Sequence, residues 1–237
     1  MGSWDGFADS PLPIPCSLCC AMIITIDGPA GAGKSSAARA LAKRLGFDFL
    51  DTGAMYRAVA LAGLRAGVNF DDPAAVTQFL AGLHVDVSPG RVVLNGEDVT
   101  GAIRTAEVTA VAGRVAANPL VRRYLVGRQR AVAAGRNIVC EGRDHGTVAF
   151  PDAACKFFLV ADPLERARRR QREMAARGEK LTLDEVRQAQ AVRDQRDASR
   201  DVAPMVPAAD AVVLDSTSLS PDEVVDRMEQ EVRRRLP

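Results

Sequence analysis

The chain has 237 residues, of which 47% are hydrophobic and 26% are charged, and its formal net charge is only +1. This ordinary globular composition argues against general disorder, and the length suits one α/β domain with small insertions rather than two full domains. No apolar run approaches the ~20 residues needed to span a bilayer, so no membrane association is expected.

The chain begins with a segment that we do not expect to join the fold. Residues 1–21 lack the basic region of a secretory signal, and the apolar run after them is needed as the first strand. We therefore predict a disordered N-terminal tail. Its three cysteines, Cys16, Cys19 and Cys20, form a C-x-x-C-C group, but no second pair follows, so no zinc site is expected.

Two further cysteines, Cys140 and Cys155, lie in apolar runs and are interpreted as small core residues. Nothing in the sequence suggests a fold that depends on disulfides, so we expect a location in a reducing cytoplasm. We also expect the protein to be a monomer.

Short β-like runs alternate with amphipathic helical stretches along most of the chain. The predicted strands are residues 22–26, 47–50, 137–140, 156–160 and 211–214. The predicted helices are residues 35–45, 54–66, 120–134, 164–177 and 221–235. This alternation predicts an α/β fold with a central parallel β-sheet flanked by helices on both faces.

One segment breaks this alternation. Residues 83–99 read LHVDVSPGRVVLNGEDV, in which two strands are joined by the turn signal Ser88-Pro89-Gly90 and followed by a turn at Asn95-Gly96. We predict a small inserted subdomain with antiparallel strands over residues 69–118. The core domain then comprises residues 22–68, 119–162 and 201–237.

The first predicted strand leads into a glycine-rich turn. The run MIITIDGPAGAGKSS contains Gly28-x4-Gly33-Lys34-Ser35, a complete Walker A pattern between a strand and a helix. Such glycines let backbone N–H groups converge on phosphate oxygens, while Lys34 reaches the β- and γ-oxygens and the Ser35 hydroxyl is placed to ligate Mg²⁺. A turn without a ligand would not explain the lysine and the hydroxyl. The candidate residues for binding ATP are Gly28, Pro29, Ala30, Gly31, Ala32, Gly33, Lys34, Ser35 and Ser36.

The second strand ends in the run DTGAMYR, with Thr52 at the strand end and Arg57 about one helical turn later. Neighbouring parallel strands share one crevice at their carboxyl ends, so Arg57 is predicted to face the phosphates held by the first loop. Thr52 is a candidate substrate-binding residue beside it. A position on the helix surface is the alternative for Arg57.

The strand at residues 137–140 runs into three charged residues, Glu141, Arg143 and Asp144. Glu141 stands where a Walker B acid would hold the water shell of the metal, and Arg143 is suited to neutralise a phosphate. Asp144 is suited to read a base, because a carboxylate accepts hydrogen bonds from the exocyclic amine of cytosine but repels the O4 carbonyl of uracil. A loop held by an Arg143–Asp144 salt bridge is the simpler alternative.

With these motifs, the chain resembles the bacterial cytidylate kinases, a family of P-loop nucleoside-monophosphate (NMP) kinases, from Met22 onward. The resemblance lies in the runs IDGPAGAGKSS, DTGAMYR, NGEDVTGAIRT, NPLVRRYLVGRQR, EGRDHGTVAFPDA and RDQRDASRDVAPMVPAADAVVLDST. It implies a P-loop kinase with an NMP-binding insertion, which transfers the γ-phosphoryl group of ATP to CMP or dCMP and gives CDP or dCDP and ADP. It also implies that Arg57, Arg143 and Arg200 bind the acceptor phosphate, that Arg122 and Asp144 read the cytosine, and that Arg193 and Asp197 face the ribose hydroxyls.

Much of the arginine falls between Arg166 and Arg200, where it is interleaved with acidic residues. By itself this block is typical of a solvated helical face or of a local anion site. The resemblance implies a mobile helical lid at residues 163–200 that closes over ATP, excludes water and places arginines near the transferred phosphoryl group. Binding of nucleic acid is not expected, because acids interrupt the arginines and no aromatic residues are interleaved.

Two positions depart from the family pattern. Gly113 stands where the family often has a serine that contacts the base, and that base contact is therefore not predicted here. His145 replaces the usual apolar residue after Arg143 and Asp144, and we expect its side chain to point to solvent.

The expected reaction is a direct in-line transfer without a covalent intermediate. The acceptor phosphate is already anionic near neutral pH, so Lys34, Arg57 and Arg143 act by positioning and electrostatics, and we assign no general base. A kinase for AMP, UMP or shikimate stays an alternative, because a P-loop alone identifies a nucleotide but not a reaction. A GTPase-like switch is disfavoured, since the chain has no N-K-x-D motif.

Overall fold

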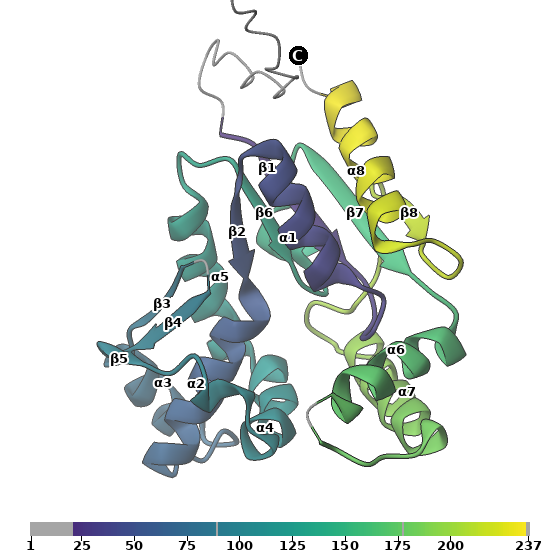
Figure 1. Ribbon diagram of the computed structural model, residues 1–237. Helices are drawn as coiled ribbons and strands as arrows, with labels where there is room; N and C mark the ends of the chain where they lie inside the picture. Colours follow the sequence, from purple (N-terminus) through teal and green to yellow (C-terminus); the bar gives the residue numbers. More distant parts are fainter. Residues whose placement is uncertain (1–20, 89, 177, 236–237) are drawn as a thin grey trace, which may run out of the picture.

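The computed structural model describes residues 21–88, 90–176 and 178–235, so the predicted tail and its cysteine group lie outside the described residues. The centre of the fold is a five-stranded parallel sheet in the order β2-β6-β1-β7-β8 (Figure 1). Each strand lies within one residue of its predicted bounds, which confirms the predicted sheet. The strands are β1 (Ile23–Asp27), β2 (Asp48–Asp51), β6 (Ile138–Glu141), β7 (Cys155–Val160) and β8 (Val212–Asp215).

Alternate side chains of the central strands enter two separate cores, one on each face of the sheet. Ile24 and Ile26 of β1 pack with α1 and α8, whereas Ile138 and Cys140 of β6 pack with α2 and α5. Such burial on both faces is expected of a parallel sheet covered by helices. The four helices are α1 (Lys34–Leu45), α2 (Thr52–Ala66), α5 (Pro119–Ala133) and α8 (Pro221–Arg235).

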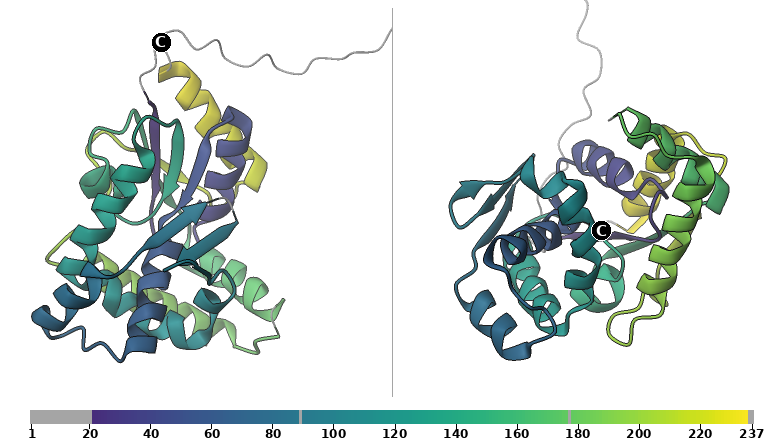
Figure 2. Two further views of the ribbon diagram at one scale, coloured as in Figure 1. Left: turned by 90° about the vertical axis from the view of Figure 1, so that its left-hand side faces the viewer. Right: turned by 90° about the horizontal axis from the view of Figure 1, so that it is seen from below.

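Two smaller groups of elements, here called appendages, lie side by side at the carboxyl ends of the strands, as Figure 1 and the view from below in Figure 2 show. The first contains a three-stranded antiparallel sheet, which confirms the predicted antiparallel element, although Pro89 of the predicted turn lies outside the described residues. Its elements are α3 (Pro73–Ala81), β3 (Val85–Ser88), β4 (Arg91–Leu94), β5 (Glu97–Asp98), the 3₁₀ turn η1 (Ala102–Arg104) and α4 (Ala106–Ala117). The second consists of α6 (Pro163–Ala175) and α7 (Leu183–Ala198).

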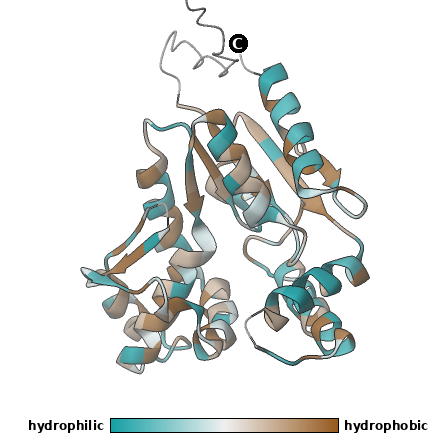
Figure 3. Cartoon of the chain, viewed as in Figure 1, coloured by the Kyte–Doolittle hydropathy of each residue, from teal (hydrophilic) through white to brown (hydrophobic). Residues whose placement is uncertain are grey.

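The helices α3 and α4 were not predicted, and α7 lies in the segment predicted as a helical lid, although no bounds were predicted for it. In α7 hydrophobic residues do not gather on one face, so its sequence lacks the periodicity that marks an amphipathic helix. A local signal does mark where α7 begins, because Thr182 and Glu185 form a reciprocal capping box. The polar character of the second appendage is plain in Figure 3, where α6 is largely teal and the sheet strands are brown.

None of the helices in the described part of the chain combines the length and the apolarity needed to cross a bilayer. Cys140 and Cys155 are free and buried, as predicted. The exact limits of the core, the insertion and the lid stay a prediction.

Candidate active site

The Walker A loop connects β1 to α1 at the carboxyl edge of the sheet. At Gly28 the backbone has a φ of +135°, and a Cβ atom there would lie 2.1 Å from the carbonyl oxygen of Leu159. Only glycine fits this close approach of two backbones. Lys34 opens α1, is 7% exposed, and donates a hydrogen bond from Nζ to the carbonyl of Pro29 at 2.7 Å. Ser36 follows in the first turn of α1 and is exposed.

Burial, followed by the charge of Arg143, lowers the pKa of Lys34 well below its ordinary value, whereas Glu141 acts in the opposite direction. A buried ammonium group with a lowered pKa is stabilised by any negative charge brought next to it. Lys34 is therefore set to bind an anionic oxygen at this loop.

The hydroxyl of Ser35 and the carboxylate of Glu141 meet beside the loop. Ser35 Oγ lies 2.6 Å from Oε1 and 2.7 Å from Oε2 of Glu141, which comes from the end of β6. The hydroxyl of Thr52 fixes the same strand end by donating to the carbonyl of Glu141 at 2.6 Å. Hydroxyl and carboxylate oxygens are the donors that Mg²⁺ prefers, so this pair fits the predicted metal site.

Arg143 spans the gap between the Walker A loop and α7. Its guanidinium donates to the carbonyl of Gly28 at 3.0 Å and to the carboxylate of Asp197 at 3.0 Å. Arg57, from α2, lies 3.6 Å from Asp51 at the end of β2. Both arginines therefore lie at the same carboxyl edge of the sheet as the loop.

Asp197 is the centre of an arginine cluster. Its side chain is 3% exposed and contacts Arg143, Arg200 at 2.5 Å and Arg193 at 4.0 Å. Burial and then the charge of Arg143 lower the pKa of Arg193 to about 10. One carboxylate thus balances three cations, which leaves a net positive charge for an anionic ligand.

The predicted base-reading residues meet in a buried ion pair. Arg122 of α5 binds Oδ2 of Asp144 and also donates to the carbonyl of Ala116 at 3.2 Å. The two charged side chains are 5% and 6% exposed. No hydrogen bond from the described residues reaches the other carboxylate oxygen, Oδ1. The simpler alternative of an Arg143–Asp144 salt bridge is therefore wrong, because Asp144 pairs with Arg122 and Arg143 pairs with Asp197.

Burial raises the pKa of Asp144, with the charge of Arg122 acting in the opposite direction. The ring of Tyr56 lies 5.8 Å from the guanidinium carbon of Arg122. Burial raises the pKa of Tyr56 to about 12, so this phenol is neutral at physiological pH. The ion pair thus lies in a largely dry part of the site.

The prediction that His145 points to solvent is wrong. Its side chain is 4% exposed, and its ring lies close to Gly142 and to the carboxylate of Asp27, 3.5 Å from Nδ1. The cause is a short π-helical turn, His145–Ala149, that carries the ring under β1. Asp27 holds this turn by accepting hydrogen bonds from the backbone N–H groups of His145 and Gly146, at 2.9 and 2.8 Å.

Asp194 of α7 makes contacts that the sequence analysis did not identify. It accepts a hydrogen bond from the backbone N–H of Ala30, at 3.1 Å, and pairs with Arg166 of α6. Arg166 in turn donates to the carbonyl of Ala30 at 3.1 Å. The Walker A loop therefore contacts both helices of the second appendage, and the run RDQRD around Asp194 was the only sequence signal for this.

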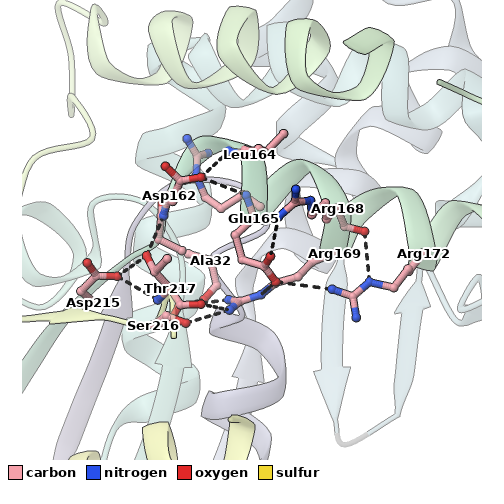
Figure 4. A network of polar contacts seen from close by, with 12 residues as sticks. Ala32, Asp162, Leu164, Glu165, Arg168, Arg169, Arg172, Asp215, Ser216 and Thr217 are labelled. Carbon is pink, nitrogen blue, oxygen red and sulfur yellow. Dashed lines mark hydrogen bonds and ion pairs between the residues drawn. The ribbon is translucent and has the colours of Figure 1, made fainter. Parts of the chain in front are cut away.

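A polar network ties the start of α6 to β8 and to the Walker A loop (Figure 4). Ser216 is 2% exposed, lies 3.1 Å from the carbonyl of Ala32, and accepts a hydrogen bond from Arg169 at 3.1 Å. Asp162 accepts from the backbone N–H groups of Leu164 and Glu165, which fixes the first turn of α6. Helix α6 is thus linked to the loop by hydrogen bonds through Arg169 and Ser216, and the sequence analysis did not identify Ser216.

Comparisons with known proteins identify the family of the chain. The family model described as cytidylate kinase matches residues 24–234. A cytidylate kinase from Geobacter sp. (strain M21) is 49% identical over 219 residues, which cover 91% of this chain and 94% of that protein. One from Rhodopirellula baltica is 47% identical over 212 residues, covering 90% of this chain and 93% of its own length. The chain therefore belongs to the cytidylate kinase family.

Proposed function

We propose that this chain is a kinase that transfers the γ-phosphoryl group of ATP to CMP or dCMP. The observation that carries the proposal is the buried pair of Arg122 and Asp144 at the same edge of the sheet as the Walker A loop. Arg122 holds Oδ2 of Asp144, so Oδ1 is available to accept a hydrogen bond from the exocyclic amine of cytosine. The names of the relatives, cytidylate kinase, support the same acceptor.

The donor nucleotide binds along the Walker A loop in this proposal. The backbone N–H groups between Gly28 and Ser36 receive its phosphates at the N-terminus of α1, and Lys34 binds their oxygens. Mg²⁺, ligated by the Ser35 hydroxyl with Glu141 orienting its water shell, would neutralise charge on these phosphates.

The acceptor binds across from this loop. Arg57, Arg143 and Arg200 bind its phosphate, with Thr52 beside them, and Arg193 and Asp197 face its ribose hydroxyls. The net positive charge around Asp197 supports this assignment, because a phosphate would share the three arginines that this carboxylate now pairs.

The chain acts by bringing two anions together and holding them in line. Lys34, Arg57 and Arg143 lower the repulsion between donor and acceptor phosphates, and closure of residues 163–200 excludes water that would otherwise accept the phosphoryl group. The acceptor oxygen carries negative charge before the reaction, so no side chain is assigned as a general base.

A steady-state assay of ADP release tests the proposal. The purified chain is supplied with ATP, Mg²⁺ and one acceptor at a time: CMP, dCMP, UMP, AMP or shikimate. We expect turnover with CMP and dCMP well above the other three. Equal turnover of UMP and CMP would rule out the base-reading role of Asp144, and the ratio of CMP to dCMP turnover measures the contribution of the 2′-hydroxyl.

We also propose that the enzyme works in the cytoplasm. The support is the state of Cys140 and Cys155, which are free thiols inside the core.

A further inference from the structure

A lid arginine lies against a glycine of the insertion. Gly113 is in the middle of α4, and a Cβ atom built there would lie 2.2, 2.5 and 2.7 Å from Nη2, Cζ and Nη1 of Arg196 in α7. No φ in the left-handed region requires glycine at this position. Glycine is also an unfavourable residue in a helix interior. The space that Gly113 leaves is therefore used by the side chain of Arg196.

Arg196 differs from its neighbours in having no acidic partner in the part of the chain that the structure describes. Arg193 and Arg200 contact Asp197, and Arg166 pairs with Asp194. For Arg196, by contrast, no ion pair or side-chain hydrogen bond occurs among the described residues. No ion pair among the described residues therefore accounts for the position of the Arg196 side chain against α4.

The contact lies between the two parts of the proposed acceptor site. Gly113 precedes Ala116 by one helical turn, and the carbonyl of Ala116 accepts a hydrogen bond from Arg122 of the base-reading pair. Arg196 directly precedes Asp197, the centre of the arginine cluster. The Gly113–Arg196 contact is thus the place where α7 reaches the insertion next to both groups.

We propose that Arg196 is a positioning residue for the acceptor nucleotide. By packing on Gly113, its guanidinium sets the distance between α4 and α7 and so places Asp197 and its arginines relative to the Arg122–Asp144 pair. The other end of this link is the contact of Asp194 with the Walker A loop, which ties α7 to the donor side. The inference rests on the proposed function, because it concerns the KM for CMP.

The test is a double-mutant cycle of Gly113→Ala and Arg196→Ala in the full chain. In Gly113→Ala the new methyl group displaces only the flexible end of Arg196, so the fold is kept while the contact is lost. We expect each single variant to raise the KM for CMP about fivefold, with the KM for ATP and the kcat changed by less than about twofold. The double variant should match the single variants, because both remove the same contact.

Matched controls are available on the same elements. Gly127 is a helical glycine of α5 at which a Cβ atom would meet nothing within 4 Å, so Gly127→Ala should leave the KM for CMP unchanged. Arg187 is an exposed arginine of α7 that pairs with Asp184 in its own helix, and Arg187→Ala should also leave that KM unchanged.

Three results would overturn the inference: an unchanged KM for CMP in Gly113→Ala, an additive double variant, or equal increases in the KM values for CMP and ATP. In each case the wild-type chain phosphorylates CMP, so the proposed function stands while the role of Arg196 is lost. Absence of CMP turnover by the wild-type chain would overturn both.

Discussion

Replacing Asp144 with asparagine tests the base-reading pair with almost no change in side-chain volume. The carboxylate can only accept hydrogen bonds, whereas an amide presents both a donor and an acceptor. A hydrogen bond to a charged group contributes about 1.5–3 kcal/mol, so Asp144→Asn should lower kcat/KM for CMP about 10- to 100-fold. The amide can donate to the O4 carbonyl of uracil, so kcat/KM for UMP should rise relative to CMP.

The same substitution has a predictable effect on stability. Arg122 is 5% exposed, and Asp144→Asn leaves its charge without a counter-ion. Removing one partner of a buried ion pair costs about 3 kcal/mol or more, which lowers the Tm of a domain of this size by about 6–12 °C. Kinetics should therefore be measured well below the Tm of the variant, with far-UV circular dichroism as the check on folding.

The assay is ADP release with CMP and with UMP, at saturating ATP and Mg²⁺. Arg122→Ala is the companion variant, because it removes the cation and leaves the carboxylate in place. Arg122→Ala should lower kcat/KM for CMP without raising kcat/KM for UMP relative to CMP. A ratio of CMP to UMP turnover that is unchanged in Asp144→Asn would refute the argument, because a folded variant would then read the base without this carboxylate.

Three further predictions concern the pH dependence, the metal and the loop. Because burial raises the pKa of Asp144, its carboxylate should take up a proton at a higher pH than an ordinary aspartate does. Lowering the pH from neutral should therefore raise the KM for CMP but not the KM for ATP, as measured in initial-rate assays. Ser35→Ala should weaken the apparent affinity for Mg²⁺ about 10- to 100-fold in a metal titration of ADP release, and an unchanged titration would refute the metal site. Gly28→Ala should cost about 2 kcal/mol or more in urea unfolding, because its Cβ would overlap the carbonyl of Leu159, whereas Gly67→Ala, with open space, should cost less.

The sheet was predictable because each strand is an apolar run between turn signals. For parallel strands that are buried on both faces, this pattern alone is enough to assign the strand. Motifs at strand ends were predictable for a related reason. The carboxyl ends of parallel strands meet at one edge, so Ser35, Arg57 and Glu141 had to lie near one another once the strands were assigned. The family resemblance, rather than spacing, implied that Arg122 and Asp144 belong to one site, and the ion pair between them was not predicted.

The rest depended on contacts between distant segments. His145 looks polar and exposed in the sequence, yet the π-helical turn after β6 brings its ring beneath β1, where Asp27 holds the backbone. Asp194 lies in an arginine-rich run that is also typical of a solvated surface, and only the position of α7 brings it to Ala30. Sequence patterns report which face a residue occupies within its own element, but they do not report which neighbour that face meets.

The charges of the site suggest why its affinity for the acceptor depends on geometry. Asp197 already pairs with three arginines, so a phosphate that binds there shares these cations with the carboxylate instead of meeting unpaired ones. The net electrostatic gain on binding is the attraction between the arginines and the phosphate minus what the arginine–Asp197 pairs and the phosphate lose. Such a difference is sensitive to small shifts in distance. A residue that sets the position of α7 without touching the phosphate, as proposed for Arg196, then alters acceptor affinity even though it makes no direct contact with the ligand.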